Sequence, residues 1–356
     1  MEEFYGEFSF NGHRCTEFGL HYIPSSSNRW YSSPSWKDIS ATVTGRHGKY
    51  KYGSTVEART FTLECYFEDA TIEQLEAMQR WLHRNQTGKL IFDDRPYVYY
   101  TVSPSQPSKG DIWASAYSSA ISHRGSGKCT LYFEAAWPFG VLAQNSYTGY
   151  DSNGIRRHTG LLRSTQMPPQ PSPAAGDFML YNPGTEYTWP TFTFEGSAPN
   201  GLKITNHTTG ETCTLTAFPV GQADTGIKID GETGMITALP LGEPRWSCHS
   251  DGYIRLAPNL DYYRDIEVGT TAGSNAISIY YYPGINETFV GKYVYLQNDW
   301  YRIVSVSDDG SSAVLNGNVP EGRIESTDIV PMNELTLEGD GLQLTNFTVD
   351  YKAYVR

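Results

Sequence analysis

Asp93 and Asp94 come nearest to hydrolytic chemistry in this sequence, because a pair of carboxylates can cleave a glycosidic bond. Such a pair must face its substrate from about 5–10 Å apart with converging geometry, and adjacent carboxylates rarely do so. The alternative is a turn before Pro96, in which the carboxylates accept hydrogen bonds from backbone N–H groups. We favour the turn.

A metal site is suggested most closely by Cys248 and His249, with Cys213 upstream. Adjacent residues of an extended chain face opposite ways, so ordinary placement in a loop is the better interpretation. The eight histidines include no H-E-x-x-H motif and no pair at helical i, i+4 spacing, which zinc hydrolases use. The sequence also lacks G-x-S-x-G, Walker A and G-x-G-x-x-G motifs. We therefore predict no catalytic residue, no metal, no cofactor and no enzymatic activity.

Binding rather than catalysis is indicated by the aromatic side chains of residues 261–337. This stretch contains more rings than a small barrel can bury, namely Tyr262, Tyr263, Tyr280, Tyr281, Tyr282, Trp300 and Tyr301. Aromatic rings stack on the C–H faces of sugars and act as hot spots of protein interfaces. The candidate contacts to a glycan or a protein partner are Tyr280, Tyr281, Tyr282, Trp300 and Tyr301. The alternative is that these rings pack between this stretch and the domain that carries it.

The charge distribution argues against nucleic acid as a partner. Residues 1–150 carry 14 Lys and Arg against 15 Asp and Glu, a net charge of −1, and residues 151–356 carry 13 against 24, a net charge of −11. The acidic second part repels nucleic-acid phosphates and anionic membrane surfaces. No run of about 18 apolar residues is present, so we also expect no insertion into a membrane.

The cysteines and the N-terminal residues indicate synthesis in a cytoplasm. The five cysteines are odd in number and far apart, without a C-x-x-C pair. Cys65 and Cys129 lie in alternating apolar runs, so we expect buried, reduced thiols. Met1-Glu2-Glu3 begins without the apolar segment of a signal peptide.

Turn and alternation signals predict a mainly β chain. Its 356 residues exceed the usual size of a single hydrophobic core, so at least two domains are expected. Four Asn-Gly and four Asp-Gly pairs favour tight strand reversals, since these residues tolerate positive φ. Arg59–Phe67 and Cys129–Trp137 alternate with a period of two, as half-buried strands do. Between them, a capping box beginning at Thr71 predicts a helix whose apolar stripe is Ile72, Leu75, Met78 and Leu82.

A linker and a second β domain are predicted beyond this unit. The proline-rich stretch at residues 168–173 cannot be a helix or a central strand and marks the linker. Short strands typical of a β-sandwich follow at Thr191–Glu195, Gly201–Asn206, Glu211–Ala217, Gly226–Asp230 and Tyr253–Leu256. An inserted small barrel is suggested by further strands at Phe289–Leu296, Trp300–Val306 and Ala313–Leu315. The alternating run Phe347–Val355 is expected to finish the sandwich.

An ordered series of motifs runs through the first 140 residues. The series is Phe8-Ser9-Phe10-Asn11-Gly12, Phe18-Gly19-Leu20, Val43-Thr44-Gly45-Arg46-His47-Gly48, Arg59–Phe67, Trp81-Leu82, Leu90–Pro96, Tyr99-Tyr100 and Trp137-Pro138-Phe139. In order and spacing it resembles the distal tail proteins of long-tailed, siphovirus-type bacteriophages. A looser likeness continues through Asn182-Pro183-Gly184, Pro190-Thr191-Phe192, Asn206–Gly210 and Tyr253–Asn259. The family's pattern lacks the stretch that this chain inserts after the last of these motifs.

The resemblance implies a fold with three parts. Residues 1–140 would form an N-terminal β-sandwich with one helix and a protruding hairpin, which assembles into a hexameric ring. Residues 141–177 would be a linker, and residues 178–356 a galectin-like β-sandwich that carries a small β-barrel-like module at about 261–337. In the ring, Arg46 is a candidate interface residue because glycines on either side let it project, although a plain hairpin tip is the alternative.

The resemblance also implies a function. The chain would be a structural virion protein, synthesised in the host cytoplasm and located at the distal end of the phage tail. Its ring would join the tail tube protein to the tail-tip hub or tail-associated lysin. The resemblance does not settle what the inserted module does. Its aromatic side chains suggest that it assists adsorption by contacting a host cell-surface saccharide, or that it anchors a receptor-binding protein.

Two functions of other classes compete with the structural hub. A polysaccharide-degrading tail-tip enzyme would need a catalytic cluster, and none is spaced for it. A carbohydrate-binding protein would account for the sandwich and the aromatic rings but leaves the motifs of residues 1–140 unexplained. Oligomeric state separates them, since a hub forms a ring and the others need not.

Overall fold

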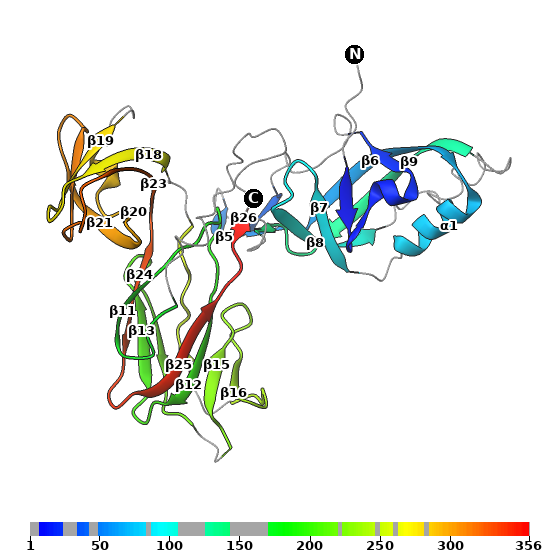
Figure 1. Ribbon diagram of the computed structural model, residues 1–356. Coiled ribbons are helices and arrows are strands. Elements are labelled where there is room, and N and C mark those ends of the chain that lie inside the picture. Colours follow the sequence, from blue (N-terminus) through cyan, green and yellow to red (C-terminus); the bar gives the residue numbers. More distant parts are fainter. Residues whose placement is uncertain are drawn as a thin grey trace. The chain divides into compact units, whose positions relative to one another are not determined.

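The computed structural model describes residues 7–23, 34–42, 49–82, 87–105, 125–142, 170–219, 223–245, 250–258, 263–280 and 285–355. Strands dominate these residues, and α1 (Ile72–Trp81) is the one α-helix among them (Figure 1). The predicted mainly β fold class is confirmed. The chain divides into two compact units, residues 1–148 with 354–356, and residues 149–353. Within the described ranges, no helix is long and apolar enough to span a membrane.

The first unit is built on one curled sheet. Its strand order is β2 (His13–Arg14), β1 (Phe8–Phe10), β7 (Gly88–Phe92), β8 (Val98–Ser105), β9 (Gly125–Ala135), β6 (Arg59–Ala70) and β3 (Leu20–Tyr22). Phe10 of β1 and Phe133 of β9 lie three strands apart in this order, yet their ring centroids are 5.2 Å apart. The sheet therefore curls until its two ends pack face to face, and these ends are the layers of the predicted N-terminal sandwich.

The ladder between β6 and β9 confirms the two strands predicted from alternation. Phe61, Leu63 and Cys65 of β6 pair with the alternating residues of β9, and their side chains are buried. The thiols of Cys65 and Cys129 face each other across this ladder. Burial raises the pKa of the Cys65 thiol, and the neighbouring Cys129 thiol raises it further.

Helix α1 begins as its capping box predicts, and a tryptophan attaches it to the sheet. The hydroxyl of Thr71 accepts a hydrogen bond from the backbone N–H of Gln74, whose side chain accepts one from the N–H of Thr71. The ring of Trp81 stacks on Phe18 with a centroid separation of 4.5 Å. Its indole N–H donates to the backbone carbonyl of Phe10 over 2.8 Å. Trp81 therefore joins the end of the helix to β1.

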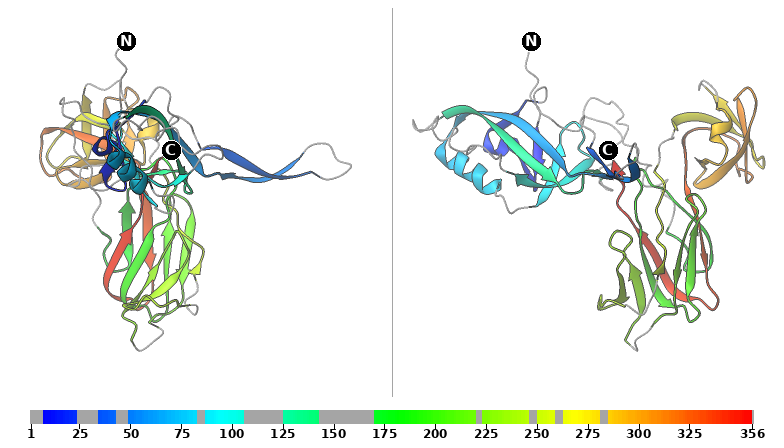
Figure 2. Two further views of the ribbon diagram at one scale, coloured as in Figure 1. Left: turned by 90° about the vertical axis from the view of Figure 1, so that its right-hand side faces the viewer. Right: turned by 180° about the vertical axis from the view of Figure 1, so that it is seen from behind.

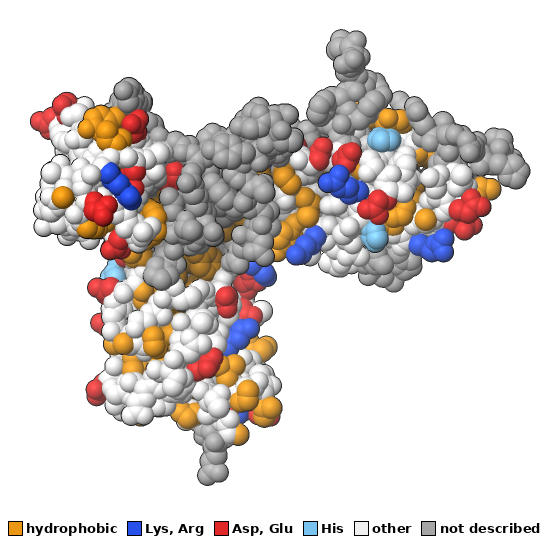
Figure 3. Space-filling view, viewed as in Figure 1, with side chains coloured by type: hydrophobic (Ala, Val, Ile, Leu, Met, Phe, Trp, Pro, Cys, Tyr) orange, Lys and Arg blue, Asp and Glu red, His pale blue; other side chains and the backbone are white. Residues whose placement is uncertain are grey.

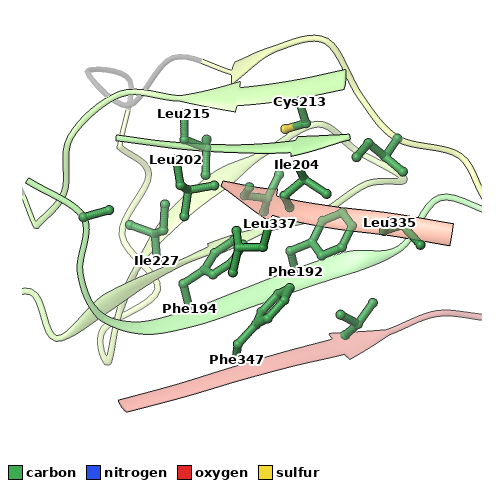
Figure 4. Packing of buried hydrophobic residues seen from close by; sticks show 14 of the residues in the cluster. Phe192, Phe194, Leu202, Ile204, Cys213, Leu215, Ile227, Leu335, Leu337 and Phe347 are labelled. Atoms are coloured by element: carbon green, nitrogen blue, oxygen red, sulfur yellow. The ribbon is translucent and has the colours of Figure 1, made fainter. Parts of the chain in front are cut away.

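The second unit contains a β-sandwich of two sheets. One sheet has the order β11 (Gly176–Leu180), β24 (Asn333–Glu338), β13 (Leu202–Asn206), β14 (Glu211–Leu215) and β17 (Ser250–Asp251). The other has the order β16 (Ile236–Leu239), β15 (Gly226–Ile229), β12 (Thr191–Ser197) and β25 (Gln343–Asp350). Apolar side chains of both sheets form one core, in which Phe347 stacks on Phe194 with ring centroids 4.7 Å apart (Figure 4).

The first four strands predicted for this sandwich are confirmed as β12, β13, β14 and β15. The fifth, Tyr253–Leu256, is wrong as a strand, because it contributes only a single bridge between Leu256 and Thr188. The edge position beside β14 is taken instead by β17.

A closed barrel is inserted ahead of β24. Its strands follow the order β18 (Tyr263–Thr270), β19 (Ala276–Tyr280), β22 (Ser312–Leu315), β21 (Asp299–Val306), β20 (Tyr293–Leu296) and β23 (Ile324–Val330). The start of the predicted strand Phe289–Leu296 is a 3-10 helix, η3 (Glu287–Phe289), whose Phe289 side chain lies in the barrel core. The barrel ends at Val330, and β24 belongs to the sandwich through its pairing with β11 and β13. The predicted end of the insertion at residue 337 is therefore too late.

The predicted closing strand Phe347–Val355 divides into two. Its first part is β25, which pairs with β12 and completes a sheet of the sandwich, as predicted. Its last two residues form β26 (Tyr354–Val355), which pairs with β10 (Gly140–Leu142) of the first unit. Alternation continues through both parts, but the partner strand changes.

Phe347→Ala should lower the free energy of unfolding of the second unit by about 3–5 kcal/mol, because the missing ring leaves a cavity beside Phe194. Urea unfolding followed by circular dichroism measures this change. Asp350→Ala, at an exposed position of the same strand, is the control and should change the stability by less than about 0.5 kcal/mol. Equal effects of the two substitutions would contradict the packing described.

Candidate functional site

A hairpin that pairs with no other described strand carries the most exposed aromatic side chain among the described residues of the first unit. Strands β4 (Trp36–Ala41) and β5 (Tyr50–Val56) form a two-stranded sheet that extends away from the curled sheet (Figure 2). We call its large exposed side chains, Trp36, Ile39, Tyr50 and Tyr52, the hairpin surface; they lie on both faces of the hairpin, and Tyr52 is 71% exposed and Ile39 is 50% exposed. A lone two-stranded hairpin is marginally stable in water, and exposed apolar side chains that gather on one element mark binding surfaces. The hairpin is therefore suited to docking on another protein.

Polar contacts connect the two strands of the hairpin, and the hairpin has a positive net charge. The Lys51 ammonium lies 2.8 Å from the Asp38 carboxylate, and the Ser54 hydroxyl donates to the same carboxylate over 2.7 Å. The Lys51 contact and then the Ser54 contact hold the pKa of Asp38 below its usual value. Residues 36–56 contain four Lys and Arg against one Asp, a formal net charge of 4 − 1 = +3. The predicted interface residue Arg46 belongs to this count, but it lies outside the described residues.

The base of the hairpin packs on a small apolar cluster. Val56, the last residue of β5, lies against buried Phe139, Val141 and Tyr354. We call these three residues the base cluster. Among the described residues, Val56 and the chain that continues into β6 attach the hairpin to the rest of the first unit.

Two of the five predicted ligand-contact residues are buried in the barrel. Trp300 is 9% exposed and Tyr301 is 8% exposed, so neither ring can stack on a saccharide from solvent. On β21, alternation turns Tyr301 into the barrel core and Trp300 outward, against the sandwich. Their prediction as contact residues is therefore wrong, and packing between the insertion and its parent sandwich is the correct alternative for Trp300.

Sequence analysis gave packing between the barrel and the sandwich only as an alternative for the aromatic rings, and it missed the polar contacts at this junction. Buried Tyr293 and Trp300 of the barrel share a cluster with Tyr181 of the sandwich. The hydroxyl of Tyr293 donates to the Glu334 carboxylate over 2.8 Å, and the Arg302 guanidinium lies 3.1 Å from the same carboxylate. Burial, and then the bond to Glu334, raise the pKa of Tyr293. These contacts attach the outer surface of β20 and β21 to the sandwich.

Tyr280 is the predicted contact residue that remains accessible. Its side chain is 39% exposed, and its ring lies over Gly269, where a Cβ atom would approach the ring carbons closely. Small polar Ser278 pairs with Gly269 on one side, and exposed Ile324 pairs with it on the other. We call these four residues the barrel platform. In Figure 3, the barrel surface shows hydrophobic patches with acidic side chains beside them. The other two predicted contact residues, Tyr281 and Tyr282, lie outside the described residues.

The remaining candidate groups form no reactive cluster. Asp93 and Asp94 lie in the turn after β7, where the N–H of Asp94 donates to the Asp93 carboxylate over 3.0 Å. The turn interpretation is therefore confirmed, and burial raises the pKa of Asp93. Among the residues that the structure describes, no three His, Cys, Asp or Glu side chains gather as a metal site would require. Cys248 and His249 lie outside those residues.

Trp300→Ala should destabilise the second unit by about 3–5 kcal/mol, since a buried indole is lost from the junction. Hydrogen exchange should accelerate in β20 and at Val330, because Tyr293 of β20 and Val330 pack in the same cluster as Trp300. Tyr280→Ala is the matched aromatic truncation at an exposed position and should cost less than about 1 kcal/mol. A stable Trp300→Ala variant with unchanged exchange would show that the junction does not depend on this ring.

Comparisons with known proteins concern mainly the first unit. Residues 14–134 match a family model described as the phage tail protein RIFT-related domain. No curated protein sequence matches the chain.

Two solved phage structures extend over most of the chain at low identity. The Dit (gp 19.1) protein of phage SPP1, described as a paradigm of the hub adsorption apparatus in phages that infect Gram-positive hosts, is 14% identical. The match covers 92% of this chain and 98% of that one, with a TM-score of 0.47. The baseplate of phage p2 in its activated conformation is 7% identical, and the match covers 95% of this chain and 99% of that one, with a TM-score of 0.33.

The family match falls on most of the curled sheet, helix α1 and the hairpin surface, and these residues carry all of the motif series except its first and last motifs. The resemblance to phage tail proteins is confirmed by this match, in which residues 14–134 fit the model of the phage tail protein RIFT-related domain.

Proposed function

We propose that this chain is a structural subunit of the phage tail hub and assembles into a hexameric ring through its first unit. The family match carries the proposal, because the matched residues include the hairpin surface. Subunits of a closed ring make head-to-tail contacts, so one surface of a copy meets a different surface of the next. A projecting apolar hairpin suits such a contact, since the neighbouring copy covers side chains that water would otherwise surround.

Charge supports the same contact. The hairpin carries a formal charge of +3, whereas residues 1–150 as a whole carry −1, so the rest of that stretch carries −1 − 3 = −4. Acidic groups on the neighbouring copy would attract the hairpin, and Arg46 would pair with one of them. Salt screens exposed charges over about 8 Å at physiological ionic strength, so assembly should be faster at low salt.

In the virion, the ring would lie at the distal end of the tail. It would join the tail tube protein to the tail-tip hub or tail-associated lysin and serve as a scaffold without catalytic activity. Support for a scaffold comes from Asp93, which lies in a turn, and from Asp38 and Glu334, which lie in ion pairs.

The purified chain should form rings, and the double variant Ile39→Ser, Tyr52→Ser should shift it toward monomers. The reason is that both substitutions remove apolar area from the hairpin surface without touching the curled sheet. Light scattering gives the mass of the particles, and negative-stain images give their symmetry.

Leu241→Ser is the control for this experiment. Leu241 is 73% exposed but lies in the second unit, so its substitution should leave the rings intact. A wild-type chain that stays monomeric at tens of micromolar, alone and with its tail partners, would refute the ring.

A second role is proposed for the barrel, namely adsorption to a host-surface saccharide through the barrel platform. The observation that favours it is the ring of Tyr280, which covers Gly269 with one face and is partly exposed. An exposed ring face can stack on the C–H face of a sugar, while Ser278 offers a hydroxyl beside it. Residues 263–330 carry four Lys and Arg against nine Asp and Glu, a formal charge of −5. A neutral or cationic saccharide therefore fits better than an anionic one.

Tyr280→Ala should weaken binding of the full chain to purified host cell-wall polysaccharide about tenfold, as expected for the loss of one stacking ring. Microscale thermophoresis measures the affinity. Val290→Ala, an exposed apolar residue of the same insertion, should leave it unchanged. Equal binding by the wild type and Tyr280→Ala would contradict the saccharide role.

Replacing residues 263–330 with a short Gly-Ser linker separates this role from that of a protein anchor. Rings should still form, and virions should adsorb poorly while keeping all their tail proteins. If a receptor-binding protein is missing from these virions instead, the barrel is its anchor.

A further inference from the structure

The C-terminal end of the chain is built into the first unit. Tyr354 pairs with Val141 and Val355 pairs with Gly140, so β26 is an outer strand beside β10. Both side chains are buried. A strand of two residues keeps its place only where neighbouring side chains hold it, so the burial of β26 has a structural cause.

The cause is the base cluster. The Tyr354 ring packs with Phe139 and Val141, and it also contacts the Trp137 ring at a centroid distance of 5.3 Å. Gly140 allows the approach of β10 to the sheet, because a Cβ at this position would collide with the side chains of Val98 and Tyr100. The C-terminal strand thus completes an apolar cluster that β10 alone leaves open.

The same cluster supports the hairpin. Val56 of β5 packs against it, and Trp36 of β4 pairs with Val56 across the hairpin. A two-stranded hairpin has little stability of its own, so packing at its base has a large share in holding it in one conformation. Removing Tyr354 would take away one of the three buried side chains on which Val56 rests.

We infer that β26 is a latch that fixes the base of the assembly hairpin, so that the hairpin surface takes its docking conformation when β26 is in place. This inference rests on the proposed ring and adds that β26 regulates the assembly of the ring. Without β26 the base cluster is incomplete, and the hairpin lacks a firm base from which to capture a neighbour. The partner controlled in this way is a second copy of the same chain.

The test compares the full chain with a chain that ends at Ala353, and with Tyr354→Ala. Hydrogen exchange followed by mass spectrometry reports on each strand. In both variants the amides of β4, β5 and β10 should exchange about tenfold faster or more, because local opening costs less free energy. The β6–β9 ladder should keep its protection. The fraction of the protein in rings, measured by light scattering, should fall as the exchange rate of the hairpin amides rises.

Two control variants match these changes. Tyr354→Phe keeps the ring in the base cluster and should restore both slow exchange and assembly. Lys352→Ala changes an exposed side chain that pairs with Glu232 of the second unit, and it should have no effect on β4 or β5.

The outcomes separate the latch from the ring. If the wild-type chain never assembles, the proposed function fails. The exchange rates of β4 and β5 in the monomeric protein still test whether β26 acts as a latch. Unchanged exchange in the hairpin after truncation overturns the latch. Loss of protection throughout the β6–β9 ladder also overturns it, because β26 would then be a general requirement for folding.

Discussion

Pairing of backbone N–H and C=O groups along strand edges is the constraint on which this structure depends. An all-β chain has many edges, and each open edge is a place where another chain can add. The inserted barrel removes its edges by closing β23 onto both β18 and β20. The curled sheet covers β10 with the last two described residues of the chain. Against this background, the β4–β5 hairpin is conspicuous, because its two strands pair only with each other among the described strands.

Apolar packing also distinguishes the β4–β5 hairpin from the other sheets. Buried aromatic rings fill the space where the curled sheet folds on itself, and a further set fills the sandwich. The hairpin instead presents its large side chains to solvent, and it combines them with a positive charge in an acidic protein. Exposed apolar area supplies affinity and opposite charge supplies attraction at a distance, which together favour association over isolation. The hairpin therefore connects the fold of the first unit to its proposed assembly.

Docking of the barrel decides which of its surfaces can meet a ligand. Tyr293 and Trp300, on β20 and β21, pack toward the sandwich, and Glu334 holds Tyr293 and Arg302 by polar contacts. Strand β19 lies three positions from β20 around the closed barrel, and it carries Tyr280. The accessible ring is thus on the side of the barrel remote from the junction. A ligand of the barrel platform would leave the junction undisturbed.

The sequence alone was sufficient for features that depend on near neighbours. Alternation located β6 and β9, the capping box located the start of α1, and the motif series indicated a phage tail protein. Tertiary structure decided the rest, because alternation states on which side of a strand a residue lies but not what covers that side. Trp300 and Tyr280 both point outward from the barrel, yet the sandwich buries Trp300 and leaves Tyr280 accessible. In the same way, the run Phe347–Val355 alternates throughout, and only the position of β10 explains why its last two residues leave the sandwich for the first unit.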